Sequence, residues 1–202
     1  MKKLKKPLFI VFLCVLICLI GCANRTVSDS KPKLSLAKHF KGLFYLGAAV
    51  NENTILGMDS KSKKIINTQF NTITPENSLK WMFIQPEPNK FNFKAADKYV
   101  EMGLKNDMYI VGHALVWHSQ LPDFMQNIDN PKQMQEHFEN HIQTLVSRFK
   151  GKINAWDVVN EAFEEDGTLR QSVFYNNLGE TYIEKAFKLA HKMDPEANLI
   201  YN

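Results

Sequence analysis

Short apolar runs rich in β-branched and aromatic residues alternate along the chain with longer amphipathic stretches, and this alternation constrains the fold more than any other feature. It is typical of parallel strands joined by crossover helices, because parallel neighbours cannot be connected by a tight turn. We predict strands at residues 44–50, 71–74, 108–117, 153–159 and 198–201. The sequence therefore indicates an α/β fold around a parallel sheet.

The clearest predicted helix has Asn130 as its N-cap and Pro131 at its first position, and Gly151 ends it. Its apolar stripe consists of Met134, Phe138, Ile142, Leu145, Val146 and Phe149. A second helix follows Asn92, and a third covers about residues 180–193. Their inward-facing residues are Ala96, Tyr99, Val100 and Leu104 in the second helix and Ile183, Ala186, Phe187 and Ala190 in the third.

The five predicted strands and their four helical connections make part of a (β/α)8 TIM barrel, which needs eight strands and about 250 residues. The chain ends on the predicted strand 198–201, whose outer edge would leave backbone hydrogen-bonding groups unpaired. We therefore expect a TIM barrel truncated to about its first five strands, with residues 35–202 as the N-terminal part of the barrel.

Residues 1–21 have the pattern of a secretory signal peptide, with four lysines in front of the apolar run 8–20. That run has 13 residues, fewer than the roughly 20 that a membrane-spanning helix needs. It is followed by glycine and Cys22, which resembles a bacterial lipobox, so we predict that Cys22 is lipidated and that residues 22–34 are a flexible tether. The alternative is ordinary cleavage, with Cys22 left unmodified.

The excess of positive charge belongs to the predicted signal peptide. The whole chain has a formal net charge of +4, and loss of residues 1–21 removes four lysines and no acid, which leaves a net charge of zero. The remaining cations are dispersed among acids, so nothing indicates a nucleic-acid partner. Only Cys22 remains of the three cysteines, which excludes an intramolecular disulfide and a thiolate metal site. We expect an exported monomer, lipid-anchored at the bacterial cell envelope and facing the surface.

Polar and aromatic residues gather where the predicted strands end, at 74–77, at 113–120 and at Asn160-Glu161. In a barrel these ends form one face, and active sites lie there. Glu161 is a candidate general acid, because a glycosidase needs one carboxyl group to protonate the leaving oxygen and a second to attack the anomeric carbon or activate water. The alternative is that Asn160 and Glu161 only cap the next helix.

Three segments, in this order, resemble glycoside hydrolase family 10: TPENSLKW at 74–81, HALVWHSQLP at 113–122 and WDVVNEAF at 156–163. The GAAV run at 47–50 is similar to the first strand of that family, and the resemblance covers about residues 40–202. It implies a TIM-barrel endo-β-1,4-xylanase that hydrolyses xylan or xylo-oligosaccharides by a retaining mechanism with two carboxylates and no cofactor.

The resemblance also implies roles for the matching residues. Glu161 would be the acid/base, and the residues that contact the sugar at the cleavage site would be Asn160, His113 and Trp117. The residues that match those binding the neighbouring sugar on the non-reducing side are Glu76, Asn77, Lys80 and Gln120. Tryptophan rings pack on the apolar faces of sugars, while carboxylate, amide and ammonium groups bind their hydroxyls. His118 has no assigned role.

By the same resemblance, the nucleophile is a second glutamate on the seventh strand, and neither that strand nor the eighth is in this chain. Glu164, Glu165 and Asp166 lie too near Glu161 in sequence to reach the opposite face of a sugar. We therefore expect the fragment alone to be inactive. Two alternatives stay open: a barrel hydrolase of the same clan acting on β-1,4-glucan or mannan, and a surface lipoprotein that binds xylan without cleaving it.

Two further features favour structural interpretations. His137 and His141 are four residues apart on one helix but lack a third ligand in register, so we predict a solvated helix face and no metal site. Trp81 and Phe83 have two interpretations, a platform for a sugar and packing of a loop over the barrel.

Overall fold

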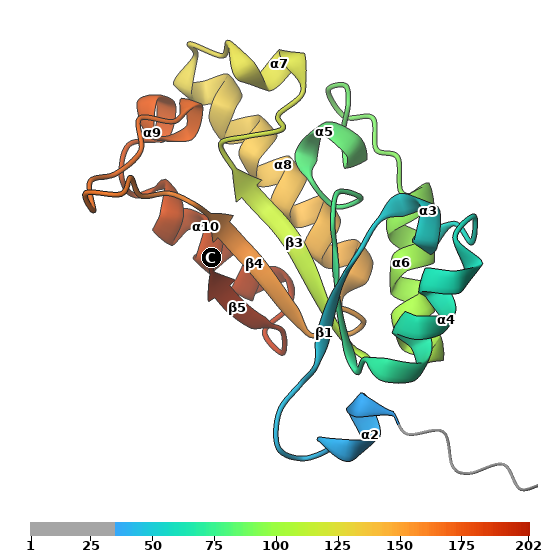
Figure 1. The fold of residues 1–202 in the computed structure, drawn as a ribbon. Helices are drawn as coiled ribbons and strands as arrows, with labels where there is room; N and C mark the ends of the chain where they lie inside the picture. Colours follow the sequence, from blue (N-terminus) through green and yellow to red (C-terminus); the bar gives the residue numbers. More distant parts are fainter. Residues whose placement is uncertain (1–34) are drawn as a thin grey trace, which may run out of the picture. The chain divides into compact units, whose positions relative to one another are not determined.

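The computed structural model describes residues 35–202 (Figure 1), so the predicted signal peptide, the tether and the Cys22 lipidation site lie outside the described residues. Five parallel strands form one sheet in the order of the sequence. They are β1 (Gly47–Val50), β2 (Thr72–Pro75), β3 (Tyr109–Trp117), β4 (Ala155–Asn160) and β5 (Asn198–Tyr201). This order is that of the first five strands of a (β/α)8 barrel, and the predicted fold class is confirmed.

The start of β1 differs most from the prediction. The strand begins at Gly47, whereas the apolar run that suggested it begins at Phe44. Phe44 and Tyr45 are 53% and 63% exposed, so these large side chains lie outside the sheet. The Leu46 N–H donates to the side-chain oxygen of Asn71 at 2.7 Å, which satisfies the backbone just before the ladder with β2 begins.

Helices connect the successive strands, and in Figure 1 α8 and α10 pass behind the sheet. The helices are α2 (Leu36–His39), α3 (Glu52–Ile55), α4 (Ser60–Gln69), α5 (Trp81–Ile84), α6 (Lys94–Lys105), α7 (Asp123–Gln126), α8 (Pro131–Phe149), α9 (Val173–Leu178) and α10 (Tyr182–Met193). The predicted start of α8 is confirmed, because the Asn130 side chain accepts from the N–H groups of Lys132 and Gln133 at 3.1 Å each.

The predicted inward face of α6 is confirmed at Ala96, Tyr99 and Val100, but it is wrong for Leu104, which is 53% exposed. The neighbouring Gly103 explains the difference. A Cβ there would lie 2.5 Å from the side chain of Ile110 in β3, so the last turn of α6 can approach the sheet closely only because this residue has no side chain. Leu104 is thereby turned outward. In α10 the predicted inward residues are buried or half-buried.

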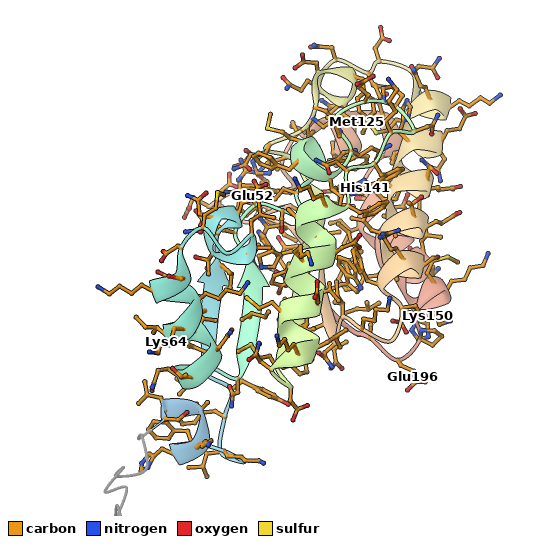
Figure 2. All side chains as sticks on the ribbon, turned by 90° about the vertical axis from the view of Figure 1, so that its right-hand side faces the viewer. Glu52, Lys64, Met125, His141, Lys150 and Glu196 are labelled. Carbon is orange, nitrogen blue, oxygen red and sulfur yellow. The ribbon has the colours of Figure 1, made fainter. Side chains whose placement is uncertain are left out.

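His141 does not lie on a solvated face, so that prediction is wrong. Its ring is fully buried and stacks on Trp81 with the centroids 3.8 Å apart, and its Nδ1 lies 2.8 Å from Gln85 Oε1. His141 stands three residues after Phe138 and four before Leu145, which puts it on the apolar stripe of α8. Figure 2 labels it on the side of α8 that faces the rest of the fold.

The same stacking decides between the two interpretations of Trp81. Trp81 is 3% exposed and also packs on Phe174, with the ring centroids 5.7 Å apart. The ring therefore belongs to the core, whereas the nearby Phe83 is 41% exposed. His137 is half-buried, and its ring lies 5.1 Å from that of Phe124.

Candidate active site

The predicted site segments meet at the carboxyl ends of neighbouring strands. Glu76 follows β2, Trp117 is the last residue of β3, and Glu161 follows β4. Trp117 and Asn160 are paired directly across β3 and β4. Because the strands are parallel, these ends lie along one edge of the sheet, where the active sites of barrel enzymes are built.

Glu161 is tied to Trp117 by a side-chain hydrogen bond, in which Trp117 Nε1 donates to Glu161 Oε2 at 2.8 Å. All six residues of β4 are buried, and the chain turns out to solvent at Glu161 with a φ of 53°, a left-handed conformation that is uncommon outside glycine. Such conformations in a non-glycine residue are concentrated at functional sites. The preceding Asn160 is 4% exposed, and its Oδ1 accepts from Asn202 Nδ2 at 2.9 Å.

His113 forms a pair with Asp157, a residue to which the sequence analysis assigned no role. The two residues face each other in the ladder between β3 and β4, and Nδ1 of His113 lies 2.8 Å from Oδ2 of Asp157. Both side chains are largely buried, at 16% and 11% exposure. The carboxylate accepts the hydrogen bond, so Nδ1 carries a proton and the ring is held in one orientation.

Lys80 joins the segment after β2 to the end of β3. Its ammonium donates to Asn77 Oδ1 at 3.0 Å and lies 4.9 Å from the centroid of the Trp117 ring. Burial lowers the pKa of Lys80, while the carboxylates of Glu76 and Glu161 act in the opposite direction. One cation thus lies in the field of both acids, and the structure brings together the predicted residues Glu76, Asn77, Lys80, Trp117 and Glu161.

Gln120 lies beside this group, on the rim of a neighbouring cavity of about 910 Å³ between the loops that follow β3 and β4. Its backbone has a φ of 49°, and its Oε1 is buried without a hydrogen-bond partner in the part of the chain described. His118 lines the same cavity, and burial together with the charge of Arg170 lowers its pKa. The structure thus places Gln120 three residues after Trp117, on the loop between β3 and α7.

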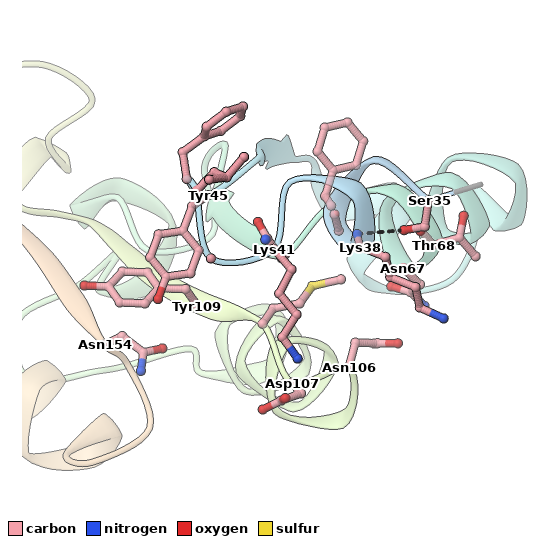
Figure 3. A pocket seen from close by; sticks show the side chains of 17 residues that line it. Ser35, Lys38, Lys41, Tyr45, Asn67, Thr68, Asn106, Asp107, Tyr109 and Asn154 are labelled. Carbon is pink, nitrogen blue, oxygen red and sulfur yellow. Dashed lines mark hydrogen bonds between the residues drawn. The ribbon is translucent and has the colours of Figure 1, made fainter. Parts of the chain in front are cut away.

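A second cavity, of about 860 Å³, is lined by residues at the opposite ends of the strands (Figure 3). Tyr109 begins β3, Asn154 precedes β4, and Tyr45 precedes β1. Residues at the amino ends of barrel strands contribute to stability, whereas chemistry is found at the carboxyl ends. This cavity is therefore separate from the candidate active site.

The acids that follow Glu161 are engaged locally. Glu164 Oε2 lies 3.1 Å from Arg170 Nη1, and Asp166 Oδ1 accepts from both the N–H and the hydroxyl of Thr168. Among residues 35–202, no three His, Cys, Asp or Glu side chains are grouped so as to hold a metal ion. In the same residues, no helix is long and apolar enough to cross a membrane.

Comparison with known proteins identifies the domain. Residues 35–202 match the model of glycosyl hydrolase family 10. The chain belongs to this family. Endo-1,4-beta-xylanase B of Thermotoga neapolitana is 41% identical over 190 residues, which cover 93% of this chain and 54% of the relative. Endo-1,4-beta-xylanase 2 of Claviceps purpurea is 42% identical over 182 residues, 90% of this chain and 54% of the relative.

Solved family 10 structures share the fold of this chain. Xylanase 10B from Thermotoga petrophila, determined in complex with xylobiose, superposes with a TM-score of 0.80 at 41% identity and covers 85% of this chain and 54% of that one. A family 10 endoxylanase from a sugarcane soil metagenome gives a TM-score of 0.78 at 44% identity, with 83% and 50% coverage. The chain spans about half the length of the curated relatives it matches.

Proposed function

We propose that the full-length protein is an endo-β-1,4-xylanase, and that residues 35–202 supply its general acid/base and the binding site for the sugar on the non-reducing side. Membership of glycosyl hydrolase family 10 and the xylanase relatives support this proposal. The observation that carries it is the hydrogen bond from Trp117 to Glu161, which puts an oriented carboxyl group beside a cation and an aromatic ring at the carboxyl ends of the strands.

In this proposal Glu161 protonates the glycosidic oxygen as the bond to the leaving sugar breaks, and then takes a proton from the attacking water. Trp117 fixes the direction of the carboxyl group through its N–H. Asp157 orients His113. The sugar at the cleavage site is bound through its hydroxyls by His113 and by Asn160. Glu76, Asn77, Lys80 and Gln120 bind the neighbouring sugar, since their groups match pairs of hydroxyls.

A retaining reaction needs a second carboxyl group about 5 Å from the first, on the other face of the sugar. Within the part of the chain described, Glu164 and Asp166 are held in local contacts and Glu165 is exposed on the same loop. We propose that a glutamate on a later strand of the complete barrel is the nucleophile. Residues 35–202 alone would then bind xylo-oligosaccharides without hydrolysing them.

We further propose that the protein is exported as a monomer and anchored to the cell envelope through a lipid on Cys22. The support is the sequence of residues 1–22: lysines, a short apolar run, then glycine and cysteine. Fractionation of cells producing the wild type and Cys22→Ala tests this point. The wild type should partition with membranes and the variant with the soluble exported fraction; equal partition of both would contradict anchoring at Cys22.

The substrate is tested by comparing the full-length protein on xylan, carboxymethylcellulose and mannan. We expect release of xylo-oligosaccharides from xylan and little product from the other two polymers. A preference for either of the other polymers would instead favour the related hydrolase. Binding to xylan without any product would favour a binding lipoprotein, and the nucleophile proposal would then fail as well.

A further inference from the structure

Arg170, on the segment between β4 and α9, is hydrogen-bonded to the loop that carries Glu161. Its Nε donates to the backbone carbonyl of Glu161 at 3.0 Å, and its Nη2 donates to the carbonyl of Phe163 at 3.3 Å. Its own backbone N–H donates to the carbonyl of Ala162 at 2.8 Å. One residue therefore binds three consecutive carbonyls, beginning with that of Glu161.

The loop needs such a support because of the conformation of its first residue. Glu161 leaves β4 with a φ of 53°, which costs about 1 to 2 kcal/mol for a residue with a side chain. The Glu161 N–H donates to the backbone carbonyl of Asn202 at 2.8 Å, and from there to α9 the isolated bridge of Phe163 with Leu169 is the one β-bridge among the described residues. The N–H side of Glu161 is thus held by the end of the neighbouring strand, whereas its carbonyl side is held by Arg170.

We propose that Arg170 is a positioning residue for Glu161. The direction of the Cα–Cβ bond of Glu161 depends on its backbone, and Arg170 holds that backbone from the carbonyl side. Trp117 holds the other end of the residue, at Oε2. The two contacts together aim the carboxyl group at the glycosidic oxygen, so Arg170 acts on proton transfer without touching the substrate. This inference rests on the proposed function, in which Glu161 is the acid/base.

The ion pair of Arg170 with Glu164 suggests a simpler role, which the contacts argue against. Nη1 lies 3.1 Å from Glu164 Oε2, and both side chains are partly exposed, at 30% and 42%. Pairs of this kind contribute about 0 to 1 kcal/mol, whereas the bonds to the two carbonyls use the fork of the guanidinium group. Glu164→Gln removes the charge of the partner and leaves the carbonyl bonds, so we expect this variant to keep the wild-type activity within about twofold.

The experiment uses the full-length protein with two substrates that differ in their need for an acid. Xylan has a poor leaving group, while a dinitrophenyl β-xylobioside releases a phenolate that needs no proton. For Arg170→Met we expect kcat on xylan to fall about 10- to 100-fold, with the KM on xylan and the glycosylation rate on the dinitrophenyl substrate within about threefold of wild type. Arg170→Lys should give an intermediate loss, because lysine cannot bind two carbonyls as a fork.

Arg148→Met is the matched control. Arg148 also makes a two-bond contact, donating to Asp97 at 2.9 and 2.7 Å, but it lies on α8 away from the site. The Arg148→Met variant should keep the wild-type kcat on xylan and the wild-type glycosylation rate on the dinitrophenyl substrate.

An equal loss on both substrates, in a variant whose thermal unfolding matches the wild type, would overturn the positioning role, as would an unchanged rate on xylan. If Arg170→Met does not fold, the same comparison is made with Arg170→Lys. A larger loss of kcat on xylan than of the glycosylation rate on the dinitrophenyl substrate supports the positioning role, and an equal loss overturns it. A wild type that hydrolyses neither substrate would instead refute the proposed function, and the inference with it.

Discussion

Trp117 and Glu161 join two neighbouring strands at the edge where the candidate site lies, with Nε1 of the tryptophan 2.8 Å from Oε2 of the glutamate. The ring of Trp117 also lies 4.9 Å from the ammonium of Lys80, so one side chain contacts both the proposed acid and the proposed sugar-binding cation. A tryptophan here thus has two uses, an N–H that orients a carboxyl group and a ring face that can pack on a sugar.

Trp117→Phe separates these two uses because it keeps a ring and removes the N–H. A hydrogen bond to a charged group contributes about 1.5 to 3 kcal/mol. We therefore expect kcat/KM of the full-length protein on xylan to fall by about 10- to 150-fold, mostly in kcat. Steady-state kinetics check this. A change confined to KM would show that Trp117 only packs on the sugar.

Asp157→Asn tests whether Asp157 orients His113. The substitution keeps the size of the side chain and replaces a charge-assisted hydrogen bond by a neutral one, a loss of about 1 to 2 kcal/mol. We expect kcat/KM on xylan to fall about 5- to 30-fold while the protein stays folded. Asp97→Asn, in the exposed pair with Arg148, serves as the control. Equal activity of the two variants would mean that the His113–Asp157 pair is not used in catalysis.

His141 should make the stability of the protein depend on pH. Burial lowers the pKa of His141 to about 3, whereas an unfolded histidine titrates near 6.5. Between these values the unfolded state binds a proton that the native state does not, so the free energy of unfolding falls as the pH falls from 6.5 towards 3. We expect His141 to account for a loss of about 2 to 3 kcal/mol between pH 7 and 4.5.

Chemical denaturation at a series of pH values measures this loss. His141→Gln cannot titrate in this range, so its stability should depend less on pH than that of the wild type, whatever its absolute value. His137→Gln, at a half-buried position on the same helix, should retain the wild-type dependence. Parallel curves for the wild type and His141→Gln would contradict a neutral buried histidine.

The sequence predicts features that depend on neighbouring residues better than those that depend on distant ones. The cap formed by Asn130 and the strand predicted at residues 153–159 follow from local pattern, and the structure has the cap and a strand at Ala155–Asn160. Leu104 was wrongly placed because the close packing of Gly103 on Ile110 is a tertiary contact. The prediction for His141 is wrong because its position on the apolar stripe of α8 determines its burial, although histidine is a polar residue.

The residues of the candidate site show the same difference between features set by neighbouring residues and features set by distant ones. Glu161 could be predicted because a carboxylate at the end of a buried strand stands out in the sequence. Asp157 was missed, although a charged residue within an otherwise apolar strand is a signal that a partner is needed; that partner, His113, comes from another strand. Arg170 has no comparable signal, since its partners are mainly backbone carbonyls, which every residue has.

The acid/base role of Glu161 is tested most directly by Glu161→Ala in the full-length protein, with Glu165→Ala, an exposed acid of the same loop, as the control. We predict that Glu161→Ala slows xylan hydrolysis by about 100-fold or more and leaves the glycosylation step on a dinitrophenyl xylobioside nearly unchanged. Glu165→Ala should retain both rates. An equal loss on both substrates in Glu161→Ala would contradict the role of Glu161 as the proton donor.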